Sequence, residues 1–247
     1  MRRMARFLLG VVGLASAAGL VALALDRESP AVVAAPADIT IGLFTSLPIM
    51  WAEDADVGSM LTDKAPPHWA LSVLRGKHGT QPLDVLQPIP AGIDLLVLAQ
   101  PRPLSPPENV ALDAWVRGGG KVLLFADPML TRESMFAPGD PRRPQDIAML
   151  SPILTRWGLS LAFDEDQPVG TREVGLWGDR LPVNLPGQFT ITDAKACSAL
   201  ADGLVARCRI GRGAVLAVAD AAMLEPAEGE AATMRAAMLA NLLAKAR

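Results

Sequence analysis

The sequence predicts a layered α/β fold with a mainly parallel sheet. Short apolar runs typical of strands alternate along the chain with segments whose apolar residues recur at helical spacing. One run, IDLLVLAQP over residues 93–101, is almost continuously apolar, as a parallel strand buried on both faces should be. Hydrophobic residues make up 51% of the 247 residues, which is ample for the core of one such domain.

The first elements of the domain follow from composition and from the residues that punctuate the chain. DITIGLFTS over 38–46 is rich in β-forming residues and predicts a strand. PPHWALSVLRGKHG over 66–79 predicts a helix, because prolines stand at its start and Gly79 lies just past its end. PLDVLQ over 82–87 predicts a second strand, which the buried run at 93–101 follows.

SPPENVALDAWVR over 105–117 carries the strongest helix signals. Ser105 suits the N-cap, Pro106 suits the first helical position, and Glu108 completes a Ser-x-x-Glu capping box. The face expected to pack on the sheet is formed by Leu112, Trp115 and Val116.

GGGKVLLFADP over 118–128 places three glycines between a helix and a strand. A loop that binds nucleotide phosphates runs in the order strand, glycines, helix, so that N–H groups at a helix N-terminus meet the phosphate. Here the order is helix, glycines, strand, which indicates a turn and not a nucleotide site. We therefore expect Gly118 to end the helix at positive φ, with Gly119 and Gly120 turning the chain into the strand.

GRGAVLAVAD over 211–220 has the same pattern as GGGKVLLFAD over 118–127. Each stretch places glycines ahead of an apolar run that ends in aspartate. The two stretches predict two core strands, which end at Asp127 and Asp220. Any glycine turn that leads into a buried strand draws on similar residues, so the match does not establish a duplication.

CSALADGLVARC over 197–208 predicts a C-terminal β-hairpin. Asp202 and Gly203 tolerate the positive φ of a two-residue turn, and pairing outward from that turn sets Cys197 directly opposite Cys208. Directly opposed residues lie within disulfide reach, and an exported compartment would oxidise the pair. Counting from the turn makes this a hydrogen-bonded pair, whose wider spacing would strain a bridge. The alternative is two reduced thiols packed on one sheet face.

The N-terminus predicts a membrane segment. Residues 7–25 carry no charge, arginines precede them and Asp26 follows them. This length matches a bilayer core, and leading arginines favour an orientation that sends the following chain across the membrane. We expect an uncleaved anchor over 1–25, a linker over 26–37 and one exported domain over 38–247. The alternative is a signal peptide cleaved after Ala37.

Charge and residue types restrict the function. Residues from 26 onward carry 20 basic and 26 acidic side chains, a net charge of −6, which argues against nucleic-acid binding. The residues that follow the predicted strand ends are Gln100, Asp127 and Asp220, none of them a serine or cysteine nucleophile. The two histidines and two cysteines lack ligand spacing. We expect no catalytic residue, metal or cofactor.

IDLLVLAQPRPLSPPENVALDAWVRGGGKVLLFADP over 93–128 resembles the soluble domain of GldG-like auxiliary proteins of gliding-motility-type ABC transporters, which is related to the GIFT domain of an intraflagellar-transport component. The shared features are a strand before a Pro-containing loop, a capped helix, a glycine turn and a strand ending in Asp-Pro. GRGAVLAVADAAMLE and the helix ATMRAAMLANLLAKAR after it are similar to that family's closing elements. The resemblance implies a three-layer sandwich like that of class I glutamine amidotransferases, used for interaction and not catalysis.

The carboxyl edge of the sheet is the expected site of contact with a ligand or partner. Ligands of open α/β sheets gather where strands end, and the residues predicted there are Thr45, Ser46, Gln100, Asp127 and Asp220. The alternative is that the two aspartates only cap turns.

Two functions are therefore carried forward. The favoured one is a non-catalytic module tethered in the inner membrane by a single pass. Its domain would face the periplasm, if the source is a bacterium, and would serve as an accessory to ABC-transporter subunits. The alternative is an unrecognised or degenerate hydrolase of amidotransferase-like layout.

Overall fold

The computed structural model describes residues 39–51, 53, 67–76 and 78–247. The anchor predicted over 1–25 and the linker predicted over 26–37 lie outside the described residues. No helix in the described part of the chain is both long and apolar enough to span a bilayer. Residues from Asp38 to Arg247 belong to one compact unit.

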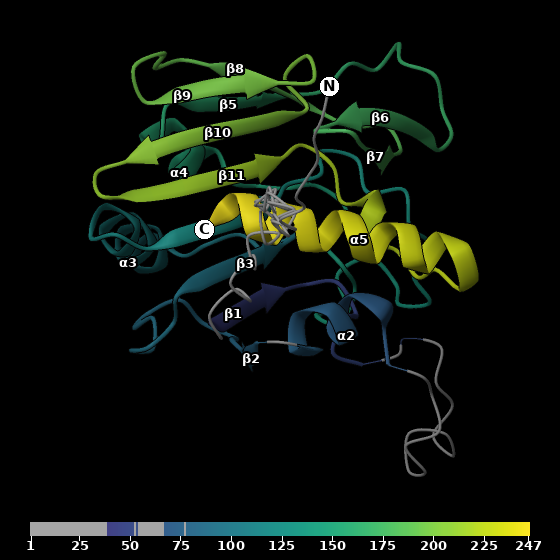
Figure 1. Cartoon of the computed structure of the whole chain (residues 1–247), viewed down its shortest axis with the longest axis horizontal. Coiled ribbons are helices and arrows are strands. Elements are labelled where there is room, and N and C mark those ends of the chain that lie inside the picture. The colour runs from purple at the N-terminus through teal and green to yellow at the C-terminus, as the bar shows by residue number, and fades with distance from the viewer. Residues whose placement is uncertain (1–38, 52, 54–66, 77) are drawn as a thin grey trace, which may run out of the picture. The chain divides into compact units, whose positions relative to one another are not determined.

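A seven-stranded sheet forms the centre of this unit (Figure 1). In spatial order its strands are β2 (Gly79–Pro82), β1 (Thr40–Thr45), β3 (Leu95–Ala99), β4 (Lys121–Phe125), β11 (Gly213–Val218), β10 (Val205–Ile210) and β9 (Cys197–Leu200). The strands from β2 to β11 run parallel, and β10 and β9 continue the sheet antiparallel. The predicted mainly parallel sheet with a C-terminal hairpin is confirmed.

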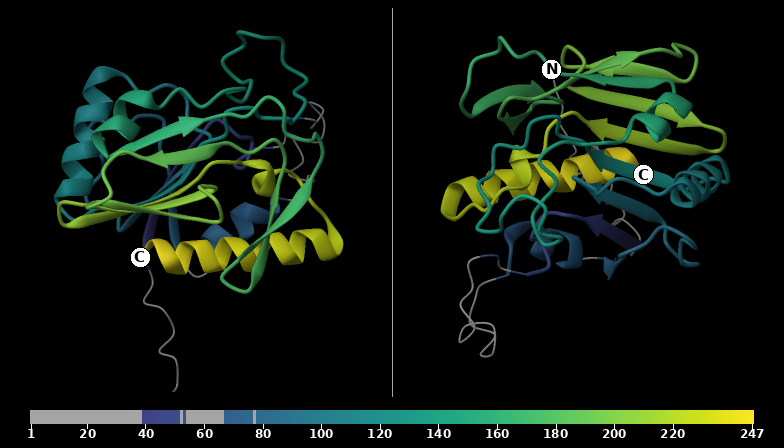
Figure 2. Two further views of the ribbon diagram at one scale, coloured as in Figure 1. Left: turned by 90° about the horizontal axis from the view of Figure 1, so that it is seen from above. Right: turned by 180° about the vertical axis from the view of Figure 1, so that it is seen from behind.

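Helices cover both faces of the sheet (Figure 2). On one face, α5 (Gly229–Ala246) packs on β4 and β11 and on α2 (Trp69–Gly76). On the other face, α3 (Pro106–Arg117) packs on β11 and on α4 (Ser151–Arg156). The result is three layers, helix on sheet on helix. Every residue of β3 is buried, as its continuous apolar run predicts.

The chain between β4 and β9 adds two small antiparallel sheets that the sequence did not lead us to expect. Their strands are β5 (Leu159–Ala162) with β8 (Gln188–Ile191), and β6 (Arg172–Leu176) with β7 (Asp179–Val183). A short 3₁₀ helix, η1 (Ala222–Leu224), links β11 to α5.

The predicted start of α3 is confirmed. Ser105 caps the helix, and the side chain of Glu108 accepts a hydrogen bond from the Ser105 N–H at 2.9 Å, which completes the capping box. Glu108 also accepts a 2.7 Å hydrogen bond from Arg102 and a 3.1 Å hydrogen bond from the N–H of Leu86. The guanidinium of Arg102, and then these N–H donors, hold the pKa of Glu108 down at about 2.

Two predictions of where elements begin and end are wrong. The edge strand is Gly79–Pro82 and not 82–87, because the N–H of Leu86 is taken by Glu108 and not by a neighbouring strand. At the end of α3, Gly118 has φ −71°, and Gly119 takes the positive φ of +120°. The N–H groups of Gly119 and Gly120 bond the carbonyls of Val116 and Trp115, so the left-handed residue comes one position later than expected.

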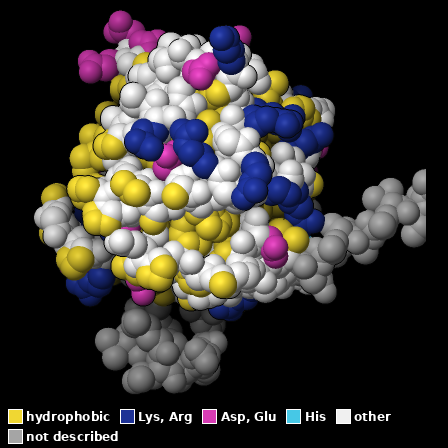
Figure 3. Space-filling view, turned by 90° about the vertical axis from the view of Figure 1, so that its left-hand side faces the viewer, with side chains coloured by type: hydrophobic (Ala, Val, Ile, Leu, Met, Phe, Trp, Pro, Cys, Tyr) yellow, Lys and Arg dark blue, Asp and Glu magenta, His cyan; other side chains and the backbone are white. Residues whose placement is uncertain are grey.

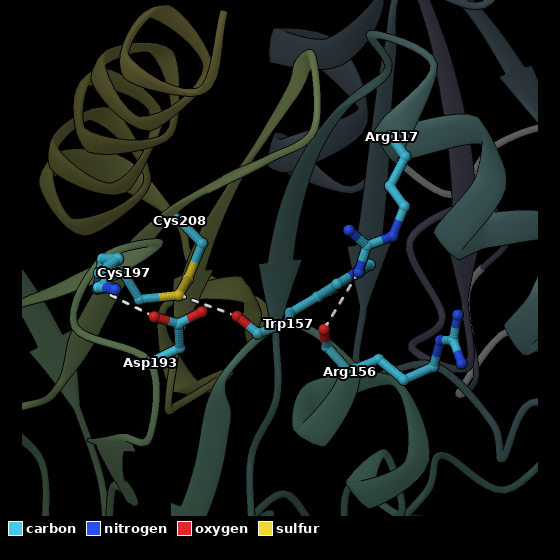
Figure 4. The surroundings of a disulfide bond; sticks show 7 residues. Arg117, Arg156, Trp157, Asp193, Cys197 and Cys208 are labelled. Atoms are coloured by element: carbon cyan, nitrogen blue, oxygen red, sulfur yellow. Dashed lines mark hydrogen bonds between the residues drawn. A yellow bond between two sulfur atoms is a disulfide. The ribbon is translucent and has the colours of Figure 1, made fainter.

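The disulfide between Cys197 and Cys208 is confirmed, with 4.1 Å between the two Cα atoms (Figure 4). The register of β9 and β10 places the two cysteines directly opposite each other, as predicted. The Sγ of Cys197 lies 3.0 Å from the carbonyl oxygen of Trp157. The pair is not hydrogen-bonded, contrary to the prediction, because Arg209 N bonds Ala196 O one position along.

The turn explains this shift. Ala201 as well as Asp202 and Gly203 has positive φ, so the strands stop at Leu200 and Val205 and the turn takes four residues instead of two. The alternation of hydrogen-bonded and non-hydrogen-bonded pairs therefore moves by one position, and the cysteines fall on a closely spaced pair.

Candidate interaction site at the carboxyl edge of the sheet

The register of the parallel strands brings the predicted residues to one edge. Thr45 lies beside Ala99, Ala99 beside Phe125, and Phe125 beside Val218. The residues that follow these positions are Ser46, Gln100, Asp127 and Asp220, so all five predicted residues meet at the carboxyl edge. What each of them contacts there decides what the edge can do.

Thr45 and Ser46 bond to the backbone of their neighbours. The Oγ1 of Thr45 donates to Ala99 O at 2.8 Å and accepts from Leu47 N at 2.9 Å. The Oγ of Ser46 donates to Gln100 O at 2.5 Å and accepts from Gln145 N at 3.0 Å. Both hydroxyls therefore tie the end of β1 to adjacent segments.

Gln100 is fully buried and sits at φ +45°. Its Nε2 donates to Asp127 O at 3.0 Å and to Gln145 O at 2.8 Å, and its Oε1 accepts from Asp127 N at 2.8 Å. A buried amide is stable only when both ends are bonded, and here both are. This side chain joins the ends of β3 and β4 to the loop that follows β4.

Asp127 and Asp220 are each 1% exposed and accept from backbone N–H groups. Asp127 accepts from Met129 N at 2.8 Å and from Ala221 N at 3.0 Å. Asp220 accepts from Ala222 N at 2.6 Å and from Asn184 N at 2.9 Å. Each carboxylate thus caps the turn after its own strand and also holds a second segment.

Burial changes the protonation of these carboxyls. It raises the pKa of Asp127 to about 6; nearby Glu225 adds to the rise, while the bonded N–H groups oppose it. Burial, and then the charge of Asp127, raise the pKa of Asp220 well above its usual range. Burial also raises the pKa of Glu225, so the pKa values of three neighbouring carboxyls lie above their usual range.

Cations surround the carboxyl cluster. The Nη1 of Arg235 donates to the backbone carbonyl oxygen of Glu225 at 2.8 Å, and Arg132 pairs with the buried Glu53 at 3.0 Å. Burial lowers the pKa of His68 to about 4, and the charges of Arg132 and Arg235 add to this. Glu53, His68, Arg132 and Glu225 come from loops, so no strand-end pattern in the sequence could have pointed to them.

The arrangement holds the edge closed. The side chains of all five predicted residues form hydrogen bonds with backbone groups of the chain itself. The described residues contain no group of His, Cys, Asp and Glu suited to a metal ion. The segments at this edge also carry exposed apolar side chains. Exposed large hydrophobic side chains lie on the segments after β1 and after β4: Trp51 (38%), Met129 (41%), Met135 (67%), Ile147 (54%) and Met149 (56%). We call these five residues the apolar rim.

Residues 40–165, about half of the chain, match the model of a family described as "ABC-type uncharacterized transport system". No curated protein sequence is significantly similar to the chain.

Several solved structures resemble the chain at low sequence identity. An exo-β-1,4-mannosidase from Opitutaceae bacterium strain TAV5 is 14% identical with a TM-score of 0.49, over 85% of this chain and 35% of that one. A cytoplasmic protein from Salmonella typhimurium LT2 is 12% identical with a TM-score of 0.48, over 85% of this chain and 99% of that one. The N-terminal domain of mmIFT52 is 11% identical with a TM-score of 0.45, over 81% of this chain and 95% of that one. The chain spans about a third of the length of the mannosidase.

Proposed function

The chain belongs to the ABC-type uncharacterized transport system family, and on that premise we propose that it is a non-catalytic accessory subunit of an ABC transporter. Residues 7–25 would hold it in the inner membrane by a single pass, with the α/β domain on the periplasmic side. Within the family we place it with the GldG-like auxiliary proteins. The family match over residues 40–165 is the observation that carries this proposal.

The hydrogen bonds at the carboxyl edge support a non-catalytic role. A nucleophile or general base must reach a substrate atom within hydrogen-bond distance. Ser46, Asp127 and Asp220 instead bond to the N–H and C=O groups of neighbouring loops, and both aspartates are buried. Their role in this proposal is to fix the loops that carry the apolar rim.

The apolar rim supports partner binding. Monomers rarely expose several large apolar side chains together, and such groups mark protein interfaces. Two of its members are held in place by the fold. The Trp51 ring lies 5.8 Å from that of Phe136, and Met135 N donates to the buried Glu53 at 2.9 Å. A preorganised apolar surface loses little entropy on binding a transporter subunit.

A pull-down tests the partner. The full chain, captured from detergent-solubilised membranes, should bring down the ATPase and permease subunits of an ABC transporter. Met135→Lys with Ile147→Lys should reduce recovery at least tenfold, because two charges would be buried at the interface. The matched control is Val85→Lys with Val110→Lys, which alters two similarly exposed residues elsewhere and should leave recovery unchanged. Equal recovery with both variants would remove the apolar rim from the proposal.

Fusion reporters test the orientation. Alkaline phosphatase at the C-terminus should be active, and green fluorescent protein exported there by the Sec route should stay dark. The protein should stay in the membrane pellet after a carbonate wash. Release into the soluble fraction would favour a cleaved signal peptide, and the opposite reporter pattern would contradict export.

A further inference from the structure

The opposite edge of the sheet, where the parallel strands begin, carries a concentration of cations. Here α3 ends and β4 begins, β10 turns into β11, and α4 and α5 end. We call the six basic residues of these elements the basic edge: Arg117, Lys121, Arg156, Arg209, Arg212 and Arg247. Figure 3 faces this side of the molecule and shows lysine and arginine side chains gathered over it.

Carboxylates do not neutralise the basic edge. Arg117 and Arg156 share one buried carboxylate, that of Asp113, at 3.1 and 2.5 Å, and their own side chains remain 48% and 54% exposed. Among the described residues no carboxylate forms an ion pair with Lys121 or Arg209. The six cations therefore outnumber the carboxylates of Asp113 and Asp94 beside them, although the chain from residue 26 onward carries −6.

The other two cations of the basic edge are also without an ion-pair partner among the described residues. Arg212 donates to Gly118 O at 2.9 Å, and the guanidinium of Arg247 lies 3.0 Å from a ring nitrogen of His78. Arg212 contacts a neutral carbonyl and Arg247 contacts an imidazole. These contacts hold the two guanidinium groups in place and leave their charge free to attract an anion.

A hollow of about 510 Å³ opens within the basic edge. Lys121 and Arg247 line it together with Trp115 and the glycines of the α3–β4 turn. Asp94 also lines it, with one carboxylate oxygen bonded to Thr40 N at 2.9 Å. The hollow therefore combines two cations with an indole ring, a side chain that favours the boundary between water and lipid headgroups.

The chain enters the described domain at this edge. The first strand, β1, begins at Thr40, on the same edge as Lys121 and the β10–β11 turn. The predicted linker over 26–37 has twelve residues and reaches at most about 40 Å when fully extended. If residues 7–25 cross the membrane, the basic edge is the part of the sheet that the chain enters first.

We propose that the basic edge docks on the anionic phospholipid headgroups of the membrane that anchors the chain. This inference rests on the proposed membrane tether. Lipid phosphates supply the matching charge, and the cations come from separate elements spread over one edge, as contact with an extended surface requires. Docking would orient the domain so that the carboxyl edge and its apolar rim point away from the lipid, toward a transporter subunit.

Electrostatics set the size of the effect. A cation near an anionic membrane surface contributes about fivefold to the binding equilibrium, and salt screens this attraction. Loss of three of the six cations should therefore weaken docking about a hundredfold. Raising the salt from about 0.05 to 0.5 M should release the domain without unfolding it.

Energy transfer in nanodiscs tests the proposal with the full chain. A donor dye is attached after Arg247, which lies at the basic edge, and the acceptor is carried by a labelled lipid. Transfer should be high in discs that contain phosphatidylglycerol, low in phosphatidylcholine discs, and low at high salt. Lys121→Gln with Arg209→Gln and Arg212→Gln should reduce transfer in anionic discs to the phosphatidylcholine level, with the melting temperature unchanged.

The matched control removes three exposed cations elsewhere: Arg142→Gln, Arg172→Gln and Arg180→Gln. It carries the same change in charge and should keep high transfer. Equal transfer in both lipids, or equal loss in both variants, would overturn docking at the basic edge, and an acidic protein would then be the occupant to seek.

The proposed tether is tested separately by whether the chain stays in the disc. If it is released, the tether is wrong, and sedimentation of the released chain with phosphatidylglycerol vesicles tests docking by itself. Sedimentation that is lost in the Lys121, Arg209 and Arg212 variant would support docking, and no sedimentation would overturn it.

Discussion

At the carboxyl edge of the seven-stranded sheet the polar side chains are buried and bonded to the chain's own backbone, whereas at the amino edge they are exposed cations. Gln100, Asp127 and Asp220 are at most 1% exposed, while the Arg117 and Arg156 side chains are about half exposed. The edge where α/β proteins usually bind ligands is thus used here to fix loops. Charge that is free to meet another molecule lies on the other side.

The largest expected effect comes from Gln100→Leu. The change leaves Asp127 N, Asp127 O and Gln145 O without their buried partner and puts a larger apolar residue at positive φ. We expect the free energy of unfolding to fall by about 4 kcal/mol. Urea denaturation measures it, with the exposed Gln81→Leu as the control. A loss below about 1 kcal/mol would mean that the carboxyl edge is not held by this amide.

Some features of the two edges could be predicted from the sequence, and others could not. The strand ends at Gln100, Asp127 and Asp220 could be predicted because a buried parallel strand is continuously apolar, and its first polar residue marks the edge. The start of α3 and the pairing of Cys197 with Cys208 followed from local chemistry, a capping box and a turn.

The rest depends on contacts between distant segments. Glu108 takes the N–H of Leu86 and ends the edge strand early, across a separation of 22 residues. Arg132, whose charge acts on Glu225 and His68, lies in a loop that has no local pattern. The basic edge is likewise hidden in a chain that carries −6 from residue 26 onward, because its six cations come from four separate segments that only the fold brings together.

The second prediction concerns what holds the amino edge. Cys197 and Cys208 join β9 to β10 there, across a sequence separation of 11 residues. Removing the bridge by Cys197→Ser with Cys208→Ser should cost about 3 kcal/mol, since it releases the loop entropy of the unfolded chain. The loss should be measured against the oxidised wild type. Reducing agent should lower wild-type stability and leave the variant unchanged; a variant as stable as the oxidised wild type would contradict this.

The third prediction uses the raised pKa of Asp127. The folded value is about 6 against 3.8 unfolded, so protonation stabilises the fold below pH 6, and this contribution is lost as pH rises through 6. His68 acts in the opposite sense, because its pKa is lowered to about 4 from 6.5. The quantity to measure is therefore the difference in free energy of unfolding between wild type and Asp127→Asn.

That difference should grow by about 1 kcal/mol in favour of the wild type as pH falls from 7 to 5. Thermal denaturation at several pH values measures it. The matched comparison is Asp164→Asn, which makes the same substitution at an exposed loop aspartate. Parallel curves for wild type and Asp127→Asn would mean that this carboxyl titrates alike in the folded and unfolded chain.

The smallest expected effect is at the basic edge. Lys121→Gln with Arg209→Gln removes two cations that form no ion pair among the described residues, so the free energy of unfolding should change by no more than about 0.5 kcal/mol. The change also relieves repulsion within a cluster of like charges, which opposes any loss of stability. Urea denaturation at low salt, where the repulsion is least screened, is the sensitive measurement. A loss above about 1 kcal/mol would show that these cations support the fold, and the contrast with the carboxyl edge would then disappear.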